Sequence, residues 1–433
     1  MNPRNRHKRT ASAFRHPRST RIPVAAMRLA VALVLIIPNL PTAARAASDL
    51  TDSFGQCLVR LEDRALRQGL PEPIVREVLG TLQFQPRVIE LDRSQPEFMQ
   101  SFADYLRARV TEQRVARGRE LLSRHRDLLT RLTREYGVPG HYLVAFWGLE
   151  TNFGSFLGSM PTLDSLATLA CDGRRGAFFE DELMTALRVL ERDSLVPASM
   201  RGSWAGAMGH TQFMPSSYLR YAVDGDDDGR IDLWGSEADA LASGANYLQS
   251  LGWLRGQRWG REVRLPADFN HADAGVESSR MLEQWQKLGV TAGGGQPLPV
   301  ADFEATLLLP MGHRGPGFLV YSNFEVIMRW NRSQSYAIAV GHLADRIAGG
   351  PALVAALPEQ DRALSRAGIQ AMQQRLHELG LEPGEADGIV GPATRAALRR
   401  FQRERDLVAD GYPDPATLEA VMTQAPEASG EPE

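Results

Sequence analysis

The chain of 433 residues is 43% hydrophobic and 23% charged, with a formal net charge of −3. This length allows two or three domains that each bury a core. The balance of apolar and charged residues excludes a largely disordered chain. The first 46 residues hold nine Lys or Arg and no Asp or Glu. Without them 40 basic and 52 acidic residues remain, a net charge of −12 that argues against a nucleic-acid partner.

The N-terminal segment is typical of a secretory signal peptide. An apolar run from Leu29 to Ile37 follows the basic residues and precedes the small-residue pattern Ala44-Arg45-Ala46. The run is about half of the roughly 20 residues that a transmembrane helix needs. We therefore predict a signal peptide over residues 1–46, with Met27 as the true start, since Met27-Arg28 alone would open a compact signal. These features predict export to the periplasm of a Gram-negative bacterium.

Cys57 and Cys171 are the only cysteines in the sequence. Neither directly follows the predicted cleavage site, so we expect a soluble exported protein without a lipid or membrane anchor. In an oxidising compartment the two can form one disulfide or remain separate buried thiols, because the sequence does not give their distance.

Helical patterns dominate from residue 50 to about residue 250. One predicted helix covers residues 126–136 and stops at Gly137-Val138-Pro139-Gly140, and another amphipathic run covers residues 178–190. The region therefore predicts a helical domain.

The next helix after the Pro-Gly stop carries a carboxylate on its apolar face. Leu143, Phe146, Trp147 and Glu150 recur at the i, i+3, i+4, i+7 spacing, so Glu150 is expected to point inward. Burial and a helix end near Gly154 both disfavour the anion and raise its pKa. A glycosidase needs such a protonated acid to protonate a leaving-group oxygen. The alternative is a buried Glu satisfied by an Arg or by backbone amides.

Small residues alternate with aromatic ones over residues 202–218. Such a backbone can be approached closely by a ligand, with Ser203 and Gln212 supplying hydrogen bonds to its polar groups. A tightly packed Gly/Ala helix contact is the alternative interpretation.

These segments together resemble the B-type lytic murein transglycosylases, relatives of goose-type lysozyme in fold. The resemblance covers about residues 50–345 and rests on three motifs in family order. They are Gly148-Leu149-Glu150-Thr151-Asn152-Phe153-Gly154, the segment 170–179 with its Arg174-Arg175 pair, and the segment 206–221.

The resemblance implies a single catalytic acid/base, Glu150, and a set of substrate-binding residues: Ser203, Gln212, Arg174, Arg175, Trp330, Asn331 and Tyr336. A guanidinium fork suits the carboxylate of a lactyl group or stem peptide, although a solvated Arg-Arg turn is an equal alternative. Position 330 is Trp where some relatives have Tyr. The ring can stack on a sugar face, but any role for a phenolic hydroxyl is expected to be lost.

Residues 224–232 fit the start of a calcium-binding loop, with acidic residues at positions 1, 3, 5 and 9 and Gly at position 6. Position 12 is Gly235, and the family similarly places its last acidic ligand further on, which implies Asp239. The expected ligands of a structural Ca²⁺ are Asp224, Asp226, Asp228, Arg230 and Asp239. The alternative is an acidic surface turn that holds no metal. No cofactor is expected for catalysis.

Gly and Pro become frequent between residues 260 and 321, where short strand-like pieces such as 303–309 occur. This change predicts a small β-containing subdomain in a helical body. Helix is expected again over residues 324–348, followed by a linker over residues 351–366. The predicted fold class is mainly α (α+β), with a lysozyme-like catalytic domain over residues 47–350.

Residues 367–425 predict three short helices, and residues 426–433 a disordered tail. Gly391-Pro392 opens the second helix and Asp414-Pro415 the third. The turn over residues 387–394, together with Phe401-Gln402, resembles the small peptidoglycan-binding domain of many cell-wall enzymes. A helical oligomerisation domain is the alternative.

The sequence as a whole predicts a lytic murein transglycosylase. It would cleave the β-1,4 bond between N-acetylmuramic acid and N-acetylglucosamine and leave 1,6-anhydromuropeptides, for cell-wall remodelling. One alternative is a lysozyme-type hydrolase, for which Asp164 and Asp172 are the nearby carboxylates. Another is a non-catalytic peptidoglycan-binding scaffold. The expected partners are peptidoglycan glycan strands and other cell-wall enzymes.

Overall fold

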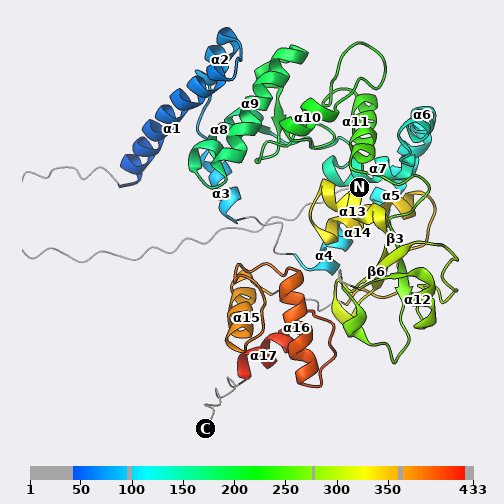
Figure 1. Cartoon of the computed structure of the whole chain (residues 1–433). Helices are drawn as coiled ribbons and strands as arrows, with labels where there is room; N and C mark the ends of the chain where they lie inside the picture. Colours follow the sequence, from blue (N-terminus) through cyan, green and yellow to red (C-terminus); the bar gives the residue numbers. More distant parts are fainter. Residues whose placement is uncertain (1–41, 95–99, 276–277, 359–363, 425–433) are drawn as a thin grey trace, which may run out of the picture. The chain divides into compact units, whose positions relative to one another are not determined.

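The computed structural model describes residues 42–94, 100–275, 278–358 and 364–424 (Figure 1). The chain divides into two units, Met1–Asp49 and Leu50–Glu433. The predicted signal peptide lies outside the described residues as far as residue 41, and so does the predicted C-terminal tail from residue 426. Among the described residues, no helix combines the length and apolar character needed to cross a membrane.

Helices make up most of the chain before residue 250. The first seven are α1 (Thr42–Arg67), α2 (Glu72–Leu79), α3 (Pro86–Ser94), α4 (Phe102–Arg109), α5 (Glu112–Arg124), α6 (Arg126–Tyr136) and α7 (Gly140–Thr151). The predicted helix over residues 126–136 is confirmed as α6, which ends because Gly137 takes the left-handed conformation with φ 80°. Helix α7 ends three residues before Gly154, since Asn152 and Phe153 already have φ of 49° and 60°.

The next helices are α8 (Thr162–Asp172), α9 (Gly176–Asp193), α10 (Pro215–Tyr221) and α11 (Glu237–Ser250). Two short antiparallel strands, β1 (Met160–Pro161) and β2 (Arg201–Gly202), and a 3₁₀ turn, η2 (Pro197–Ser199), lie among them. Helix α9 confirms the amphipathic run predicted over residues 178–190. Its apolar face packs with α8 and α1 into one core cluster, and α7 belongs to a second cluster.

A five-stranded antiparallel sheet follows, with the order β4-β6-β7-β3-β5. Its strands are β3 (Gly260–Arg264), β4 (Ser279–Met281), β5 (Thr291–Ala292), β6 (Glu304–Leu308) and β7 (Gly317–Val320). The short helix α12 (Leu282–Lys287) and the 3₁₀ turns η3 (His271–Asp273) and η4 (Gly312–Arg314) connect them. Successive side chains of β7 point into different cores. Phe318 and Val320 pack into the core that contains α7, and Leu319 packs into the core of the β-containing subdomain. The predicted β-containing subdomain is thus confirmed.

The helix predicted over residues 324–348 is wrong in one respect, because two helices occupy this stretch. They are α13 (Ser322–Trp330) and α14 (Gln334–Ile347). Asn331 caps the end of α13 in extended conformation, and the Ser333 hydroxyl accepts a hydrogen bond from the Tyr336 backbone N–H to begin α14. Helix α14 packs along α7.

The C-terminal segment confirms the three predicted helices, α15 (Arg366–Glu378), α16 (Pro392–Glu404) and α17 (Pro415–Thr423). They enclose a core of their own. Gln373, which is buried, accepts a hydrogen bond from the Gly388 N–H and donates to the Ile389 carbonyl and the Thr394 hydroxyl. These bonds fix the conformation of the turn over residues 387–394.

A disulfide joins Cys57 of α1 to Cys171 of α8. Of the two possibilities that the sequence left open, a disulfide or two buried thiols, the structure has the disulfide. The two residues are 114 positions apart in the chain. Closing so long a loop removes conformational entropy from the unfolded chain.

We expect reduction of this disulfide to lower the free energy of unfolding by roughly 4 to 5 kcal/mol, the entropic value for a loop of about this length. Thermal unfolding with and without a reductant measures the effect. The double variant Cys57→Ser/Cys171→Ser is the control and should melt at one temperature in both buffers. A wild-type melting temperature that does not respond to reductant would contradict the prediction.

Candidate active site

Glu150 lies in the last turn of α7, where protein atoms crowd around its carboxyl group and leave the residue only partly exposed. Leu143, Phe146, Trp147 and Glu150 line one small cavity of about 20 Å³. The predicted apolar face of α7 is thus confirmed. The cavity has room for about one water molecule and none for a sugar ring.

Two hydrogen-bond donors converge on one oxygen of Glu150. The Trp330 Nε1–H donates to Oε1 over 2.8 Å, and the Tyr336 hydroxyl donates to the same atom. Trp330 is the last residue of α13 and Tyr336 lies in the first turn of α14, so the break between these helices brings both donors to the acid. Within the described residues, Oε2 of Glu150 has no hydrogen-bond partner. A proton on the protonated acid is therefore carried by Oε2.

Burial raises the pKa of Glu150 to about 7. The hydrogen bonds from Tyr336 and Trp330 and the positive charge of Arg109 act in the opposite direction but do not outweigh burial. A carboxyl group with this pKa is partly protonated at neutral pH. It can donate a proton and, once ionised, accept one.

Trp330 does more than the sequence indicated. We expected its ring to stack on a sugar and the role of a hydroxyl at this position to be lost. The indole N–H supplies a hydrogen bond to the acid, and the ring packs against Phe146, Phe213 and Tyr247. Stacking of the ring on a sugar stays a prediction. The substitution of Tyr by Trp thus keeps a donor.

A second layer of contacts fixes the end of α7. The Trp147 Nε1–H donates to Nδ1 of His210 over 2.9 Å, and the Thr151 hydroxyl donates to the His210 carbonyl over 3.2 Å. Gly154 has φ 77°, and a Cβ there would overlap the His210 ring. Glycine is therefore required in this part of the motif.

Ser203 and Gln212 lie on the Gly-rich segment and are partly exposed. The Ser203 hydroxyl accepts a hydrogen bond from the Ala207 N–H over 3.0 Å. Gln212, with φ 50°, donates from Nε2 to the carbonyls of Leu157 and Gly209. Its Oε1 has no partner among the described residues and remains an acceptor for a ligand.

Arg174 and Arg175 both bind Asp92, whose side chain is fully buried. Burial alone would raise the pKa of Asp92, but the two guanidinium groups outweigh it and hold the pKa below its usual value. Each Arg side chain remains about half exposed. The pair therefore has a structural partner that the sequence did not reveal, and its binding of substrate stays a prediction. Asn331 is exposed at the end of α13, and its Oδ1 accepts a hydrogen bond from the Ser333 N–H.

Tyr105 and Arg109 of α4 were not predicted from the sequence. The Arg109 guanidinium lies over the Tyr105 ring, 5.3 Å from its centroid, and its charge lowers the pKa of Glu150. Both residues lie more than 40 positions before the acid. Their spacing carries no local motif, so only the packing of α4 reveals them.

Three of the five expected calcium ligands come together. Carboxylate oxygens of Asp224, Asp226 and Asp239 lie within 4.8 Å of one another. Asp239 is buried and accepts hydrogen bonds from the N–H groups of Gly225 and Asp232, each over 2.7 Å. Asp228 is exposed and accepts a hydrogen bond from the Arg230 N–H over 2.8 Å.

A partly protonated acid on a buried helix of a mainly helical domain is the arrangement of an enzyme that cleaves glycosidic bonds. Comparison with known proteins identifies the class more closely. Residues 53–345 match the family described as transglycosylase SLT domain, and residues 365–421 match a peptidoglycan binding domain. The chain therefore belongs to the transglycosylase SLT family, lytic enzymes that cleave the glycan strand of peptidoglycan.

Individual relatives agree with this assignment. SltB3 from Pseudomonas aeruginosa, solved in complex with NAG-anhNAM-pentapeptide, is 44% identical to this chain. The match covers 86% of this chain and 99% of SltB3, with a TM-score of 0.82. Membrane-bound lytic murein transglycosylase B of Escherichia coli is 35% identical over 250 residues, 56% of this chain and 66% of that protein. Escherichia coli Slt35, solved in complex with calcium, is 32% identical with a TM-score of 0.59 and covers 67% of this chain and 92% of that chain. The resemblance to the B-type enzymes is thus confirmed.

The pKa of Glu150 generates a prediction for the pH dependence of activity. A proton donor works only when it is protonated. Glycan cleavage should therefore be fast below pH 7, and its rate should fall as the pH rises through about 7. Tyr336→Phe removes a hydrogen bond that lowers this pKa, so the fall should move to higher pH. Initial rates of sacculus solubilisation, measured between about pH 5 and pH 9 to bracket the ionisation of Glu150, test both statements. An unmoved profile in Tyr336→Phe would show that Glu150 does not set it.

Proposed function

We propose that the chain cleaves the β-1,4 bond between N-acetylmuramic acid and N-acetylglucosamine with Glu150 as its single acid/base. The observation that supports this proposal is the pair of donors on Oε1, which leaves the proton on Oε2. In the first step Oε2 donates this proton to the glycosidic oxygen. The bond between that oxygen and C1 of muramic acid then breaks, and C1 develops oxocarbenium character.

In the second step the Glu150 anion takes the proton of the C6 hydroxyl of the same sugar. The C6 oxygen attacks C1 and closes the 1,6-anhydro ring, so no external water is consumed. The Tyr336 and Trp330 hydrogen bonds stabilise the anion between the two steps. Attack within one molecule gains from proximity, and a second carboxylate is unnecessary.

The positions of other acidic groups also favour this proposal over a hydrolase. Asp164 accepts a hydrogen bond from the Gln83 N–H over 2.6 Å, and Asp172 pairs with Arg93 over 3.0 Å. Within the described residues, the one charged group that acts on the pKa of Glu150 is the cation Arg109. An inverting hydrolase would need a carboxylate opposite the acid to activate water.

The same proposal assigns substrate binding to the polar and basic residues that the sequence predicted. Ser203, Asn331 and the unpartnered Oε1 of Gln212 would bind hydroxyl and acetamido groups of the glycan. Arg174 and Arg175, which keep exposed donors beyond Asp92, would bind carboxylates of the substrate.

We further propose that the chain is exported to the periplasm after removal of residues 1–46. The substrate class supports this location, since peptidoglycan lies outside the cytoplasm. In this proposal the C-terminal domain holds the enzyme on the sacculus while the catalytic domain acts on glycan strands.

The loop over residues 224–239 is proposed to bind a structural Ca²⁺. Three carboxylates within 4.8 Å of one another repel each other unless a cation is present, and oxygen ligands suit calcium. Asp224, Asp226 and Asp239 would hold the ion. None of these three carboxylates acts on the pKa of Glu150, so the role of the ion would be to stabilise the fold.

Mass spectrometry of soluble products from digested sacculi tests the proposed reaction. The wild-type enzyme should release 1,6-anhydromuropeptides, each lighter by one water than the corresponding hydrolysis product. Glu150→Gln keeps the shape of the side chain without the proton donor, so it should be slower on the order of a hundredfold or more.

Two outcomes would refute the proposed reaction. Reducing-end muramic acid in the wild-type digest would identify a hydrolase. Full activity of Glu150→Gln would mean that another group is the acid. The far-UV circular dichroism spectrum of the variant should equal that of the wild type, which is the control for folding.

Calcium binding should raise the melting temperature of chelator-treated protein. At free calcium a hundred times the dissociation constant the expected stabilisation is about 2.7 kcal/mol. Asp224→Asn should abolish the shift. Asp227→Asn is the matched control, because Asp227 lies in the same loop outside the group of three carboxylates. A wild-type melting temperature that is identical with and without millimolar calcium rules the site out.

A further inference from the structure

His210 joins the Gly-rich segment to the end of the helix that carries the candidate acid. Its backbone N–H donates to the Leu233 carbonyl over 2.8 Å, which fixes the residue in place. Its carbonyl accepts a hydrogen bond from the Thr151 hydroxyl, and Nδ1 of its ring accepts one from the Trp147 indole. Trp147 lies three residues before Glu150 and Thr151 directly follows it, so both bonds act on the last turn of α7.

The bond from Trp147 fixes the protonation state of the His210 ring. An indole N–H can only donate, so Nδ1 must be without a proton, and the neutral ring carries its proton on Nε2. If the ring gains a second proton, Nδ1–H and the indole N–H are two donors that face each other across 2.9 Å. The hydrogen bond then cannot form, and the buried indole N–H loses its acceptor.

The ring has little room to turn away from Trp147. His210 is 7% exposed, and its ring lies so close to the backbone of Gly154 that a Cβ there would come within 2.1 Å of the ring atom Cε1. Together with Glu150, His210 also lines the small cavity of the candidate active site. In such close packing, a proton on Nδ1 would displace the Trp147 side chain and with it the turn of α7 that carries the acid.

We propose that His210 is a positioning residue for the acid, and that it holds α7 only while its ring is neutral. In the neutral form it keeps the last turn of α7 where Glu150 meets the donors of Trp330 and Tyr336. In the protonated form the bond from Trp147 is lost, and the Glu150 carboxyl group moves relative to these donors. This role of His210 rests on the proposed function, in which Glu150 is the acid.

Burial and nearby charges decide the pH at which the ring gains a proton. Burial lowers the pKa of His210, because it disfavours the charged imidazolium. The negative charges of Glu237 and Asp232 and a hydrogen bond with the Trp234 backbone act in the opposite direction, but the pKa stays below the ordinary value of 6.5. The ring is therefore neutral at neutral pH and gains its proton only in more acidic solution.

Another histidine lies close to Trp147. The His125 ring is 5.9 Å from the indole ring, and its Nε2 pairs with Glu237 over 2.9 Å. A proton on His125 would strengthen this ion pair and break no bond to Trp147. A variant that changes His210 alone keeps His125, so it separates the effects of the two rings.

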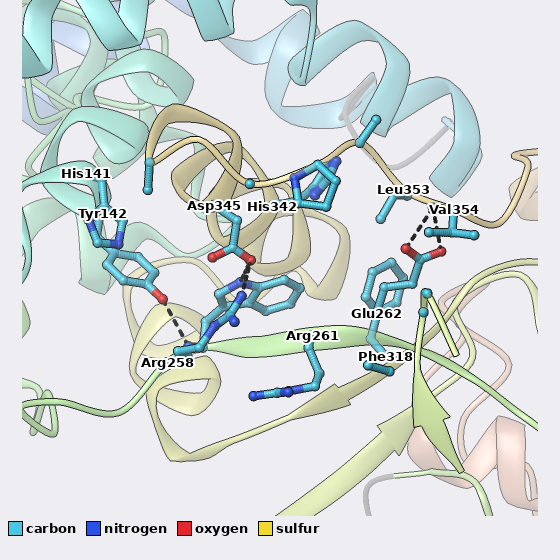
Figure 2. Close-up of a pocket in the computed structure, with 18 of the residues that line it drawn as sticks. His141, Tyr142, Arg258, Arg261, Glu262, Phe318, His342, Asp345, Leu353 and Val354 are labelled. Carbon is cyan, nitrogen blue, oxygen red and sulfur yellow. Dashed lines mark hydrogen bonds and ion pairs between the residues drawn. The ribbon is translucent and has the colours of Figure 1, made fainter. Parts of the chain in front are cut away.

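Two further histidines offer a matched control. His141 and His342 line a second cavity, of about 560 Å³, at the opposite ends of α7 and α14 (Figure 2). Burial lowers the pKa of both imidazoles to about 4, so they also gain protons at acidic pH. His141 precedes Glu150 by nine residues of the same helix, a rise of about 14 Å, so its protonation should not reach the acid.

Initial rates of sacculus solubilisation between about pH 4 and pH 7 test the proposal. The wild-type rate should fall at the acidic end of this range, separately from the fall that Glu150 causes at higher pH. His210→Asn places an amide oxygen near the position of Nδ1, where it can accept from Trp147 at every pH. Its rate at neutral pH should stay within about twofold of the wild type, and the acidic fall should be absent. His210→Leu offers no acceptor and should be about tenfold slower at neutral pH, whereas His141→Asn should keep the wild-type profile.

Three outcomes of these rates would overturn the proposal: a wild-type rate without an acidic fall, an equal fall in His210→Asn, or a wild-type rate in His210→Leu. Nuclear magnetic resonance of the indole N–H groups of the wild type gives a second test that needs no variant to fold. One indole resonance should shift over the pH range in which the rate falls, and the absence of any shift would also overturn the proposal. Product analysis and Glu150→Gln test the proposed reaction at neutral pH, where His210 is neutral, so either test can fail without the other.

Discussion

The convergence of Trp330 and Tyr336 on one oxygen of Glu150 is the interaction on which the site depends. A carboxyl group surrounded by apolar side chains would be protonated far above its usual range if burial acted alone. A carboxyl group in water would be ionised at neutral pH. Two donors from the ends of α13 and α14 counteract part of the effect of burial, and the pKa is about 7. The acid can therefore change protonation state twice within one reaction.

Much of the surrounding structure serves to hold these donors in place. The break at residues 331–333 turns the chain so that the end of one helix and the start of the next face the acid. The packing of α14 on α7 sets the distance between Tyr336 and Glu150. Trp147 and Thr151 of α7 are bound to His210, so the last turn of the helix cannot rotate away from its donors without losing buried hydrogen bonds.

The sequence predicted those parts of the fold that local patterns control. Helix α6 ends at Gly137, and the helices α16 and α17 begin at the predicted Pro residues, Pro392 and Pro415. Helical periodicity grouped Leu143, Phe146 and Trp147 with Glu150, although α7 is buried on its other sides as well. The break between α13 and α14 escaped prediction, because Ser333 acts as a cap only once Asn331 is extended.

The contacts that sequence could not give are those between distant segments. Asp92 lies over 80 positions before the Arg pair that it binds, and it looks like any other acidic residue of an amphipathic helix. Arg109 acts on Glu150 from another helix, again without a motif. Trp330 shows a different limit. The residue was identified and its ring was predicted to stack on a sugar, but the hydrogen bond from its N–H to Glu150 depends on the fold and was not predicted.

The α7 and α14 pair also explains why the two cavities are chemically different. Residues near the end of α7 and the start of α14, Glu150 and Tyr336, form the candidate active site. Residues at the opposite ends, His141, His342 and Asp345, line the second cavity. The helices between them are packed with fully buried side chains, so the close packing of α14 on α7 holds the acid and its donor in place.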